Sequence, residues 1–190
     1  LAPVVDGLPY DLTAGQRGAL DEILADASRP AGGRMLRLLH GGTGSGKTVV
    51  ALLAAAWAAA THGRCAVLLC PTALLAHQHR DTAAEVLGGH GRWNVVCVAG
   101  GGGAAAAAEV RAGTIVVGTH AVLSPGFLGA LPVPVAMAVV DEEQRFGVRQ
   151  RAALGDVAAH LLCLSGTPIP RTLAATGAGM MDVTVLLDRP

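Results

Sequence analysis

Residues Gly41 to Thr48 read GGTGSGKT, which fits the pattern G-x-x-x-x-G-K-[ST]. In such a loop the glycines let successive backbone N–H groups point at phosphate oxygens, and the start of the next helix adds positive potential. Lys47 would reach the terminal phosphates of a nucleotide, and the hydroxyl of Thr48 would bind Mg²⁺. The predicted nucleotide loop comprises Gly41, Gly42, Thr43, Gly44, Ser45, Gly46, Lys47 and Thr48.

Lys47 is the only lysine among the 14 Lys and Arg residues of the chain. An arginine is a planar fork, whereas a lysine is a slim ammonium on a flexible stem, so the two are not interchangeable beside a phosphate. Codon bias explains why the other cations are arginines, and phosphate chemistry explains why this position differs. The lone lysine therefore supports the prediction of a phosphate site.

A second group of polar residues follows the apolar run 135–140, namely Asp141, Glu142, Glu143 and Gln144. In enzymes with such a loop, an Asp at the end of a buried strand holds Mg²⁺, and a neighbouring carboxylate can polarise the attacking water. We predict that Asp141 is a metal ligand and that Glu142 is the general base. The alternative is that these acids form a solvated loop or the start of a helix.

The rest of the chain predicts the elements that position these groups. Short apolar runs recur, with helical or loop stretches between most of them, at 35–39, 65–70, 94–98, 114–117, 135–140, 160–164 and 183–187. Helices are predicted at 13–27, with Thr13 as N-cap, at 48–60 and at 104–111. Runs that are apolar on both faces and alternate with helices are typical of a parallel sheet covered on both sides. We therefore expect a three-layer α/β fold with a mainly parallel central sheet, whose functional groups gather at the carboxyl ends of the strands.

Length and composition indicate a single globular domain over residues 1–190. Hydrophobic residues make up 52% and charged residues 15%, which excludes a disordered chain; the longest apolar run, 49–60, is too short to span a bilayer, so we expect no membrane partner. The formal net charge of zero argues against nucleic-acid binding through bulk charge but leaves room for a local basic groove. The four cysteines lack zinc-site spacing and a CxxC pair, so we expect buried free thiols and a cytoplasmic protein.

Several further segments are specific enough to indicate a family. They are Leu12-Thr13-x-x-Gln16, Leu38-Leu39-His40-Gly41 into GSGKTVVA, Pro71-Thr72-Ala73-Leu74-Leu75-Ala76-His77-Gln78-His79, Gly118-Thr119-His120-Ala121, Asp141-Glu142-Glu143-Gln144-Arg145-Phe146-Gly147-Val148 and Thr167-Pro168-Ile169-Pro170-Arg171-Thr172-Leu173. With these segments the chain resembles the superfamily 2 helicases over essentially its whole length. Within that group it is most similar to the RecG-type DNA helicases and the transcription-repair coupling factors. The resemblance implies a RecA-like motor domain that hydrolyses ATP with Mg²⁺ and moves on DNA in repair and recombination.

The resemblance also implies roles for single residues. Gln16 would lie against the adenine, and Lys47, Asp141, Glu142 and Gln144 would form the hydrolytic site. Gln144 and the Ser165-Gly166-Thr167 segment, with Arg171, would link the ATP state to the grip on DNA. Contacts with the DNA backbone, which hold phosphates without reading sequence, would come from Pro71, Thr72, Gly118, Thr119 and His120.

Other readings of these last residues remain open. Thr72 could simply cap the following helix, and Gly118-Thr119 could simply be a turn. His77, His79 and His120 have no carboxylate or cysteine partner at ligand spacing, so we predict that they lie on the surface or face DNA and bind no metal.

The chain departs from the family pattern at three places. Gly42 stands where an acidic residue is usual, Gly166 where alanine is usual, and Gly177-Ala178-Gly179 where an aromatic and an acidic residue are expected. These changes leave the catalytic groups intact and would affect coupling. Gln144 favours a coupling factor, whereas Val148-Arg149-Gln150-Arg151 and GSGKTVVA favour a RecG-type protein, which we prefer.

Two other classes of function remain as alternatives, a small-molecule kinase and a catalytically silent nucleic-acid-binding module. The segments around Gln16, 118–120 and 167–171 argue against a kinase, and the intact Lys47 argues against a silent module. Because the chain begins at Leu1 without a signal-like region, we expect an internal fragment that lacks a second RecA-like domain and an N-terminal wedge region. Alone it should bind nucleotide weakly and hydrolyse it very slowly, because a second domain would supply an arginine finger.

Overall fold

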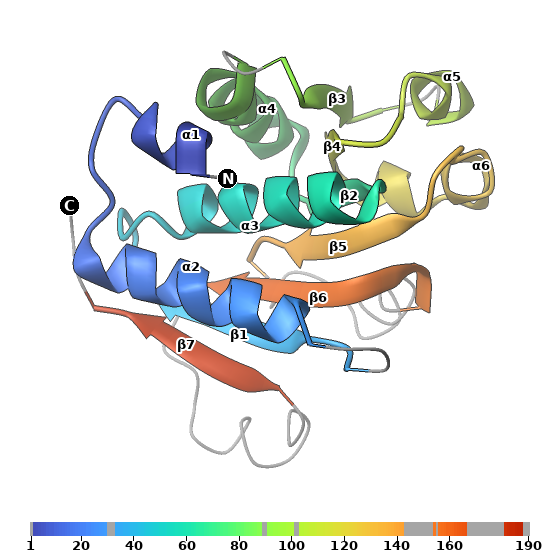
Figure 1. The fold of residues 1–190 in the computed structure, drawn as a ribbon. Coiled ribbons are helices and arrows are strands. Elements are labelled where there is room, and N and C mark those ends of the chain that lie inside the picture. The colour runs from blue at the N-terminus through green and yellow to red at the C-terminus, as the bar shows by residue number, and fades with distance from the viewer. Residues whose placement is uncertain are drawn as a thin grey trace.

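The computed structural model describes residues 2–29, 33–88, 91–100, 103–142, 154, 156–166 and 181–187 (Figure 1). The strands in this part are β1 (Leu36–Gly41), β2 (Cys65–Leu69), β3 (Asn94–Val98), β4 (Thr114–Gly118), β5 (Val135–Val140), β6 (Ala158–Ser165) and β7 (Asp182–Leu186). They form one sheet in the order β3-β4-β2-β5-β6-β1-β7, and every pairing is parallel. The predicted α/β fold is confirmed, and each strand matches a predicted apolar run to within two residues at either end.

Helices cover both faces of this sheet. They are α1 (Ala2–Asp6), α2 (Ala14–Ala27), α3 (Lys47–His62), α4 (Ala73–Leu87), α5 (Gly103–Ala108), α6 (Pro125–Leu128) and the 3₁₀ helix η2 (His120–Leu123). The predicted helices 13–27 and 48–60 are confirmed as α2 and α3. The helix predicted at 104–111 is shorter than expected, because Glu109 and Val110 lie in a turn after α5.

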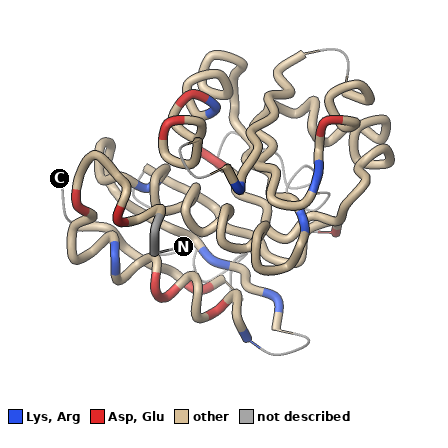
Figure 2. Tube along the Cα trace, turned by 45° about the horizontal axis from the view of Figure 1, so that its top comes forward, with Lys and Arg blue, Asp and Glu red and all other residues tan. Residues whose placement is uncertain are grey.

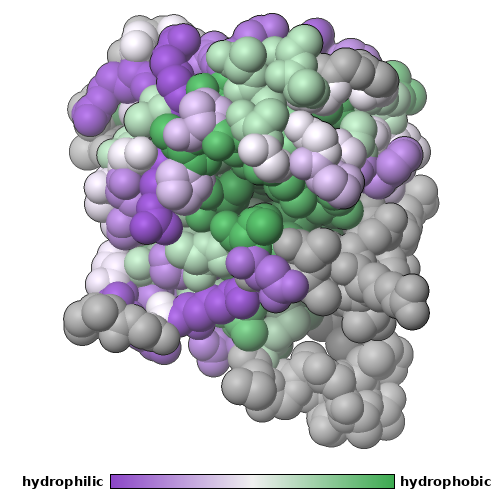
Figure 3. Space-filling model, turned by 90° about the vertical axis from the view of Figure 1, so that its right-hand side faces the viewer, coloured by the Kyte–Doolittle hydropathy of each residue, from purple (hydrophilic) through white to green (hydrophobic). Residues whose placement is uncertain are grey.

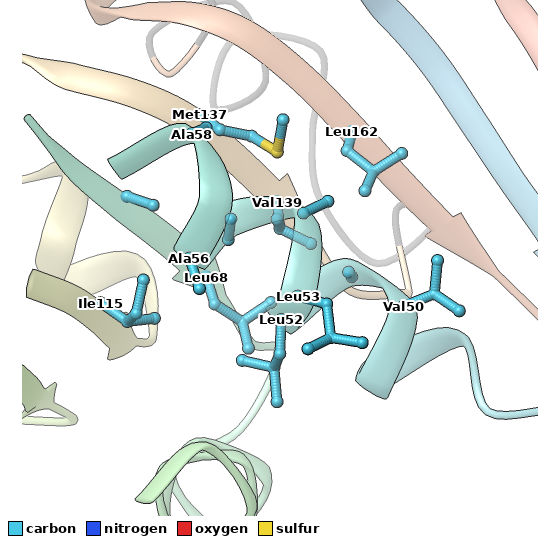
Figure 4. Close-up of a cluster of buried hydrophobic side chains, with 14 of the residues drawn as sticks. Val50, Leu52, Leu53, Ala56, Ala58, Leu68, Ile115, Met137, Val139 and Leu162 are labelled. Carbon is cyan, nitrogen blue, oxygen red and sulfur yellow. The ribbon is translucent and has the colours of Figure 1, made fainter. Parts of the chain in front are cut away.

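The strands bury both of their faces, and so the core has two halves. In β2, Leu68 belongs to the cluster shared with α2, α3 and α4, whereas its neighbours Val67 and Leu69 belong to the cluster on the side of α5, η2 and α6. Successive side chains of a strand point to opposite faces, so a run that is apolar throughout serves both halves. Figure 4 shows the first half, where Leu52 and Leu53 of α3 lie with side chains from β2, β4, β5 and β6.

Helix α3 is rich in alanine, and its middle is buried. Ala54, Ala55, Ala56, Ala58 and Ala59 are all at most 1% exposed. Because these side chains end at Cβ, the helix can lie close to the strands behind it. The helix ends at Gly63, which adopts the left-handed conformation (φ 61°) that glycine adopts at low cost. The element that follows the nucleotide loop is therefore held firmly on the sheet.

The burial of the cysteines agrees with the prediction at three of the four positions. All four cysteines are free thiols; Cys65, Cys70 and Cys163 are buried as predicted, whereas Cys97 is only partly buried. Burial raises the pKa of the Cys65 thiol to about 11, so it stays protonated at neutral pH.

Figure 2 shows cationic and acidic positions interspersed along the trace. Among the helices in the described residues, none is long and apolar enough to cross a membrane.

Candidate functional site

The predicted catalytic segments meet at the carboxyl edge of the sheet. Strands β5, β6 and β1 are neighbours, and each runs toward this edge. The nucleotide loop begins at the end of β1, Asp141 follows β5, and Ser165 ends β6, where it pairs with His40. Parallel strands bring their carboxyl ends together, which is where open α/β sheets bind ligands.

The loop after β1 has the backbone expected of a phosphate cradle. Gly44 and Gly46 have φ angles of 80° and 83°, a conformation that glycine adopts at low cost. A Cβ on Gly41 would approach the Ser45 Oγ to 2.6 Å. The Ser45 hydroxyl is buried and makes no hydrogen bond within the described part of the chain. A buried hydroxyl without a partner inside a Gly-rich loop fits a polar ligand such as a phosphate.

Lys47 is folded back onto this loop. Its Nζ donates hydrogen bonds to the carbonyl oxygens of Gly41, at 2.7 Å, and Gly42, at 2.9 Å. Burial lowers the pKa of the Lys47 ammonium, and the carboxylates of Asp141 and Glu142 oppose that effect. The ammonium therefore occupies the mouth of the cradle and lies in the field of both predicted catalytic acids.

Gln16 connects helix α2 to the nucleotide loop. Its backbone N–H bonds to the Thr13 hydroxyl while its Oε1 accepts from the Thr13 N–H, which makes a capping box at the start of α2. Its Nε2 also donates to the Ser45 carbonyl at 2.9 Å, and the side chain is buried. Gly46 leaves the space for this contact, since a Cβ there would collide with Gln16 Nε2. Gln16 is thus placed at the loop, and its contact with adenine stays a prediction.

The surroundings of Asp141 correct one prediction. His79 of α4 is not a surface residue; its Nε2 lies 2.8 Å from the Asp141 Oδ2, and both side chains are nearly buried. An ionised carboxylate only accepts, so the imidazole Nε2 donates this bond. The sequence held a signal for it, because position 79 lies three residues after Ala76 and four before Ala83, on the buried face of α4. His77 and His120 are exposed, as predicted.

Glu142 and Gly166 complete the described part of the catalytic edge. Glu142 has a φ of 54°, which is uncommon for a residue other than glycine and is found at functional sites. A Cβ on Gly166 would lie 3.5 Å from the Glu142 Oε1 and 3.9 Å from the Lys47 Nζ. Gly166 therefore borders both the predicted base and the lysine. Gln144, Thr167 and Arg171 lie outside the described residues.

The predicted DNA contacts divide into exposed and buried groups. The Thr72 hydroxyl accepts from the Leu75 N–H and caps α4, and the residue is exposed. Thr119 is 6% exposed and its side chain caps η2, so its hydroxyl is poorly placed for a phosphate. His120 is exposed and lines a hollow of about 580 Å³ with Ala99 and Ser124.

The residues at this edge can accommodate ATP and Mg²⁺. The Thr48 hydroxyl and the Asp141 carboxylate are oxygen ligands, which Mg²⁺ prefers. Within the described residues no group of three or more His, Cys, Asp or Glu side chains converges to hold a metal. That finding is compatible with Mg²⁺, which is usually held by one or two carboxylates together with substrate phosphates.

Comparison with known proteins decides the family, since residues 13–176 match the DEAD/DEAH box helicases. The chain belongs to this family. The chain is similar to the ATP-dependent DNA helicase RecG of Staphylococcus epidermidis, with 37% identity over 98% of the chain and 27% of the relative. It is 40% identical to RecG of Mycobacterium bovis over the whole chain and 28% of the relative.

A solved structure places this helicase domain in the same fold group. The UvsW helicase from bacteriophage T4 matches over all of the chain and 66% of the neighbour, with a TM-score of 0.67 at 17% identity. At that identity the likeness concerns the fold, and it confirms the predicted RecA-like architecture. The chain spans little more than a quarter of the length of its RecG relatives.

Proposed function

We propose that this helicase domain is the ATP-binding motor of a DNA helicase or translocase that acts on branched DNA or forks in repair and recombination. The observation that carries the proposal is the meeting of three groups at one edge of the sheet: the phosphate cradle, Asp141 and Glu142. Identities of 37% and 40% to proteins named ATP-dependent DNA helicase RecG support DNA as the nucleic acid on which the motor acts.

The geometry supports an order of events at the nucleotide. Lys47 would exchange the carbonyls of Gly41 and Gly42 for oxygens of the β- and γ-phosphates, to which an ammonium binds more strongly. Mg²⁺, held by Thr48 and Asp141, would neutralise charge on the phosphates. Glu142 would take a proton from the attacking water as the new P–O bond forms and the bond to ADP breaks.

The proposal includes partners that act on this domain. A second RecA-like domain would supply an arginine finger, which contributes about 10³–10⁵ in rate in related phosphoryl-transfer systems. DNA would be held through its backbone, with the exposed Thr72 and His120 and the half-buried Pro71 as candidate contacts, whereas Gly118 and Thr119 of the predicted set are buried. We also propose a cytoplasmic location, which the four free thiols support.

Family membership argues against the kinase alternative. Residues 13–176 match a helicase family, and this range includes the segments for which a small-molecule kinase has no use. Lys47 argues against the catalytically silent alternative, because its Nζ bonds to two carbonyls of the cradle and its ammonium is influenced by the charges of Asp141 and Glu142.

Fluorescent ATP binding and ATP hydrolysis, with and without single-stranded DNA, test the proposal. We expect weak Mg-ATP binding that Lys47→Ala reduces at least tenfold, and very slow hydrolysis that DNA hardly stimulates. In the longer protein that contains the adjoining domain, DNA should stimulate hydrolysis strongly, and Glu142→Gln should abolish turnover while keeping binding. Nucleotide binding that is insensitive to Lys47→Ala would refute the site. Strong DNA-stimulated turnover by the 190-residue chain would refute the need for a second domain.

A further inference from the structure

A basic pocket lies at the opposite edge of the sheet from the nucleotide loop. It has a volume of about 430 Å³, and its ionisable lining residues are Arg29, Arg34, His62, Arg64 and His160. Arg34 lies two residues before β1, Arg64 directly precedes β2, and His160 lies near the start of β6. Strands of this length place the pocket about 16–20 Å from the catalytic edge. Figure 3 views this edge and shows hydrophilic side chains around a hydrophobic centre.

Within the described part of the chain, all the ionisable residues that line the pocket are bases. The other lining residues are alanine and glycine, so they add no charge. The carboxylate of Asp26, which does not line the pocket, bridges Arg29 at 2.5 Å and also binds the buried Arg37. Because the pocket is lined by five bases and by no acid among the described residues, the lining itself is positively charged.

The positive charge around the pocket affects His160, whose ring can also donate a hydrogen bond. Burial lowers the pKa of its imidazole, and the positive charges of His62, Arg34 and Arg64 lower it further. Its Nδ1 accepts the Met35 backbone N–H at 3.3 Å, so the neutral ring carries its proton on Nε2. The rings of His160 and His62 are 6.1 Å apart. An anion in the pocket would relieve the repulsion among these groups.

We propose that the basic pocket binds a phosphate group, either of a nucleic-acid backbone or of a free phosphate ion. Arginine guanidinium groups match phosphate oxygens with paired N–H donors, and the Nε2–H of His160, which lines the same pocket, would be a further donor. Small residues between the bases leave room for the ligand. The site is separate from the nucleotide loop, and it does not depend on the motor function proposed above.

Histidine NMR on the 190-residue chain at low ionic strength tests this proposal. Titration with inorganic phosphate, pyrophosphate or a short oligo-dT should shift the His160 ring signals and raise its apparent pKa, because a bound anion stabilises the imidazolium. A stronger response to oligo-dT than to phosphate identifies a nucleic-acid backbone as the source, and the reverse order identifies a free ion. Equal shifts with chloride at matched ionic strength, or no shift, overturn the proposal.

A pair of variants locates the effect. Arg34→Gln with Arg64→Gln should weaken the anion response at least tenfold, since the variant loses two guanidinium groups that would donate charge-assisted hydrogen bonds to the phosphate. Arg34→Lys with Arg64→Lys keeps the charge and should restore part of it. Arg17→Gln, at the far end of α2, removes the same charge away from the pocket and should change nothing. Circular dichroism confirms folding of each variant, and an unaltered response in the glutamine pair refutes the site.

Discussion

The Nε2 of His79 donates a hydrogen bond to the Oδ2 of Asp141 across 2.8 Å, so a residue of helix α4 orients the predicted metal ligand. Residues that orient metal ligands typically contribute 10–100-fold to metal affinity. His79→Leu should therefore weaken Mn²⁺ or Mg²⁺ binding to the nucleotide complex about tenfold or more, as measured by calorimetry. His79→Gln keeps an N–H donor and should recover much of the affinity.

The neighbouring His77 provides the matched control. It lies on the same helix but is exposed, so His77→Leu should leave metal affinity unchanged. Nucleotide binding in the absence of metal should be similar in all three variants, which separates an effect on the carboxylate from a general loss of structure. Equal metal affinity in His79→Leu and the parent chain would show that the contact has no orienting role.

Substitution by alanine should have opposite effects on the free energy of unfolding at Gly46 and at Gly18. Gly46→Ala places a Cβ against Gln16 Nε2 and forces a left-handed φ, which together should destabilise the chain by about 1–3 kcal/mol. Gly18 lies in the exposed interior of α2 with nothing within 4 Å of its Cβ, so Gly18→Ala should stabilise by about 0.5–1 kcal/mol. Urea unfolding measures both. A Gly46→Ala variant as stable as the parent chain would contradict both the collision with Gln16 and the backbone strain.

Lys47 should react with amine reagents at a lower pH than an ordinary lysine. Burial disfavours its ammonium, so its pKa is lowered and the neutral, nucleophilic amine forms earlier as pH rises. Because it is the only lysine, labelling followed by mass spectrometry reads it directly beside the N-terminal amine. Mg-ATP should suppress the reaction at Lys47 and leave the N-terminus as an internal control. A profile equal to that of free lysine would contradict the lowered pKa.

Gly166→Ala should be tolerated. Its backbone is outside the left-handed region, and the added Cβ would make ordinary contacts with Glu142 Oε1, at 3.5 Å, and with Lys47 Nζ. Restricting the unfolded chain should then stabilise the protein by about 0.4–1 kcal/mol, with nucleotide binding retained. Thermal unfolding and fluorescent ATP binding check both expectations. A loss of stability would show that the segment after β6 needs the freedom of glycine.

The parts of the fold that follow from local pattern could be predicted from the sequence. Strand positions follow from short apolar runs, and the nucleotide loop follows from eight consecutive residues whose geometry is local. The contacts that the sequence did not reveal join distant segments. His79 and Asp141 are 62 residues apart, and the buried Arg37 reaches Asp26 in α2 and Thr184 in β7. Such pairs depend on sheet order, which a pattern along the chain does not encode.

The ion pairs of Arg37 show what the pattern of apolar residues could not predict. It stands in the middle of an apolar run and is only 8% exposed, yet it is charged. Its partners Asp26, Glu22 and Asp182 come from α2 and β7, which flank β1 only after folding. The apolar run predicted the strand correctly, whereas the ion-pair network at the edge of the sheet required the structure.

The alanines of α3 have a thermodynamic consequence for the nucleotide loop. Alanine has no side-chain rotamers to lose on folding, whereas a buried leucine loses about 0.5–1 kcal/mol of rotamer entropy. The helix that starts at Lys47 is therefore immobilised at little entropic cost, and it has few rotamer changes with which to absorb a disturbance. The loop and the helix that follows it therefore form a rigid frame at the nucleotide site, and a bound phosphate would meet a backbone that is already in place.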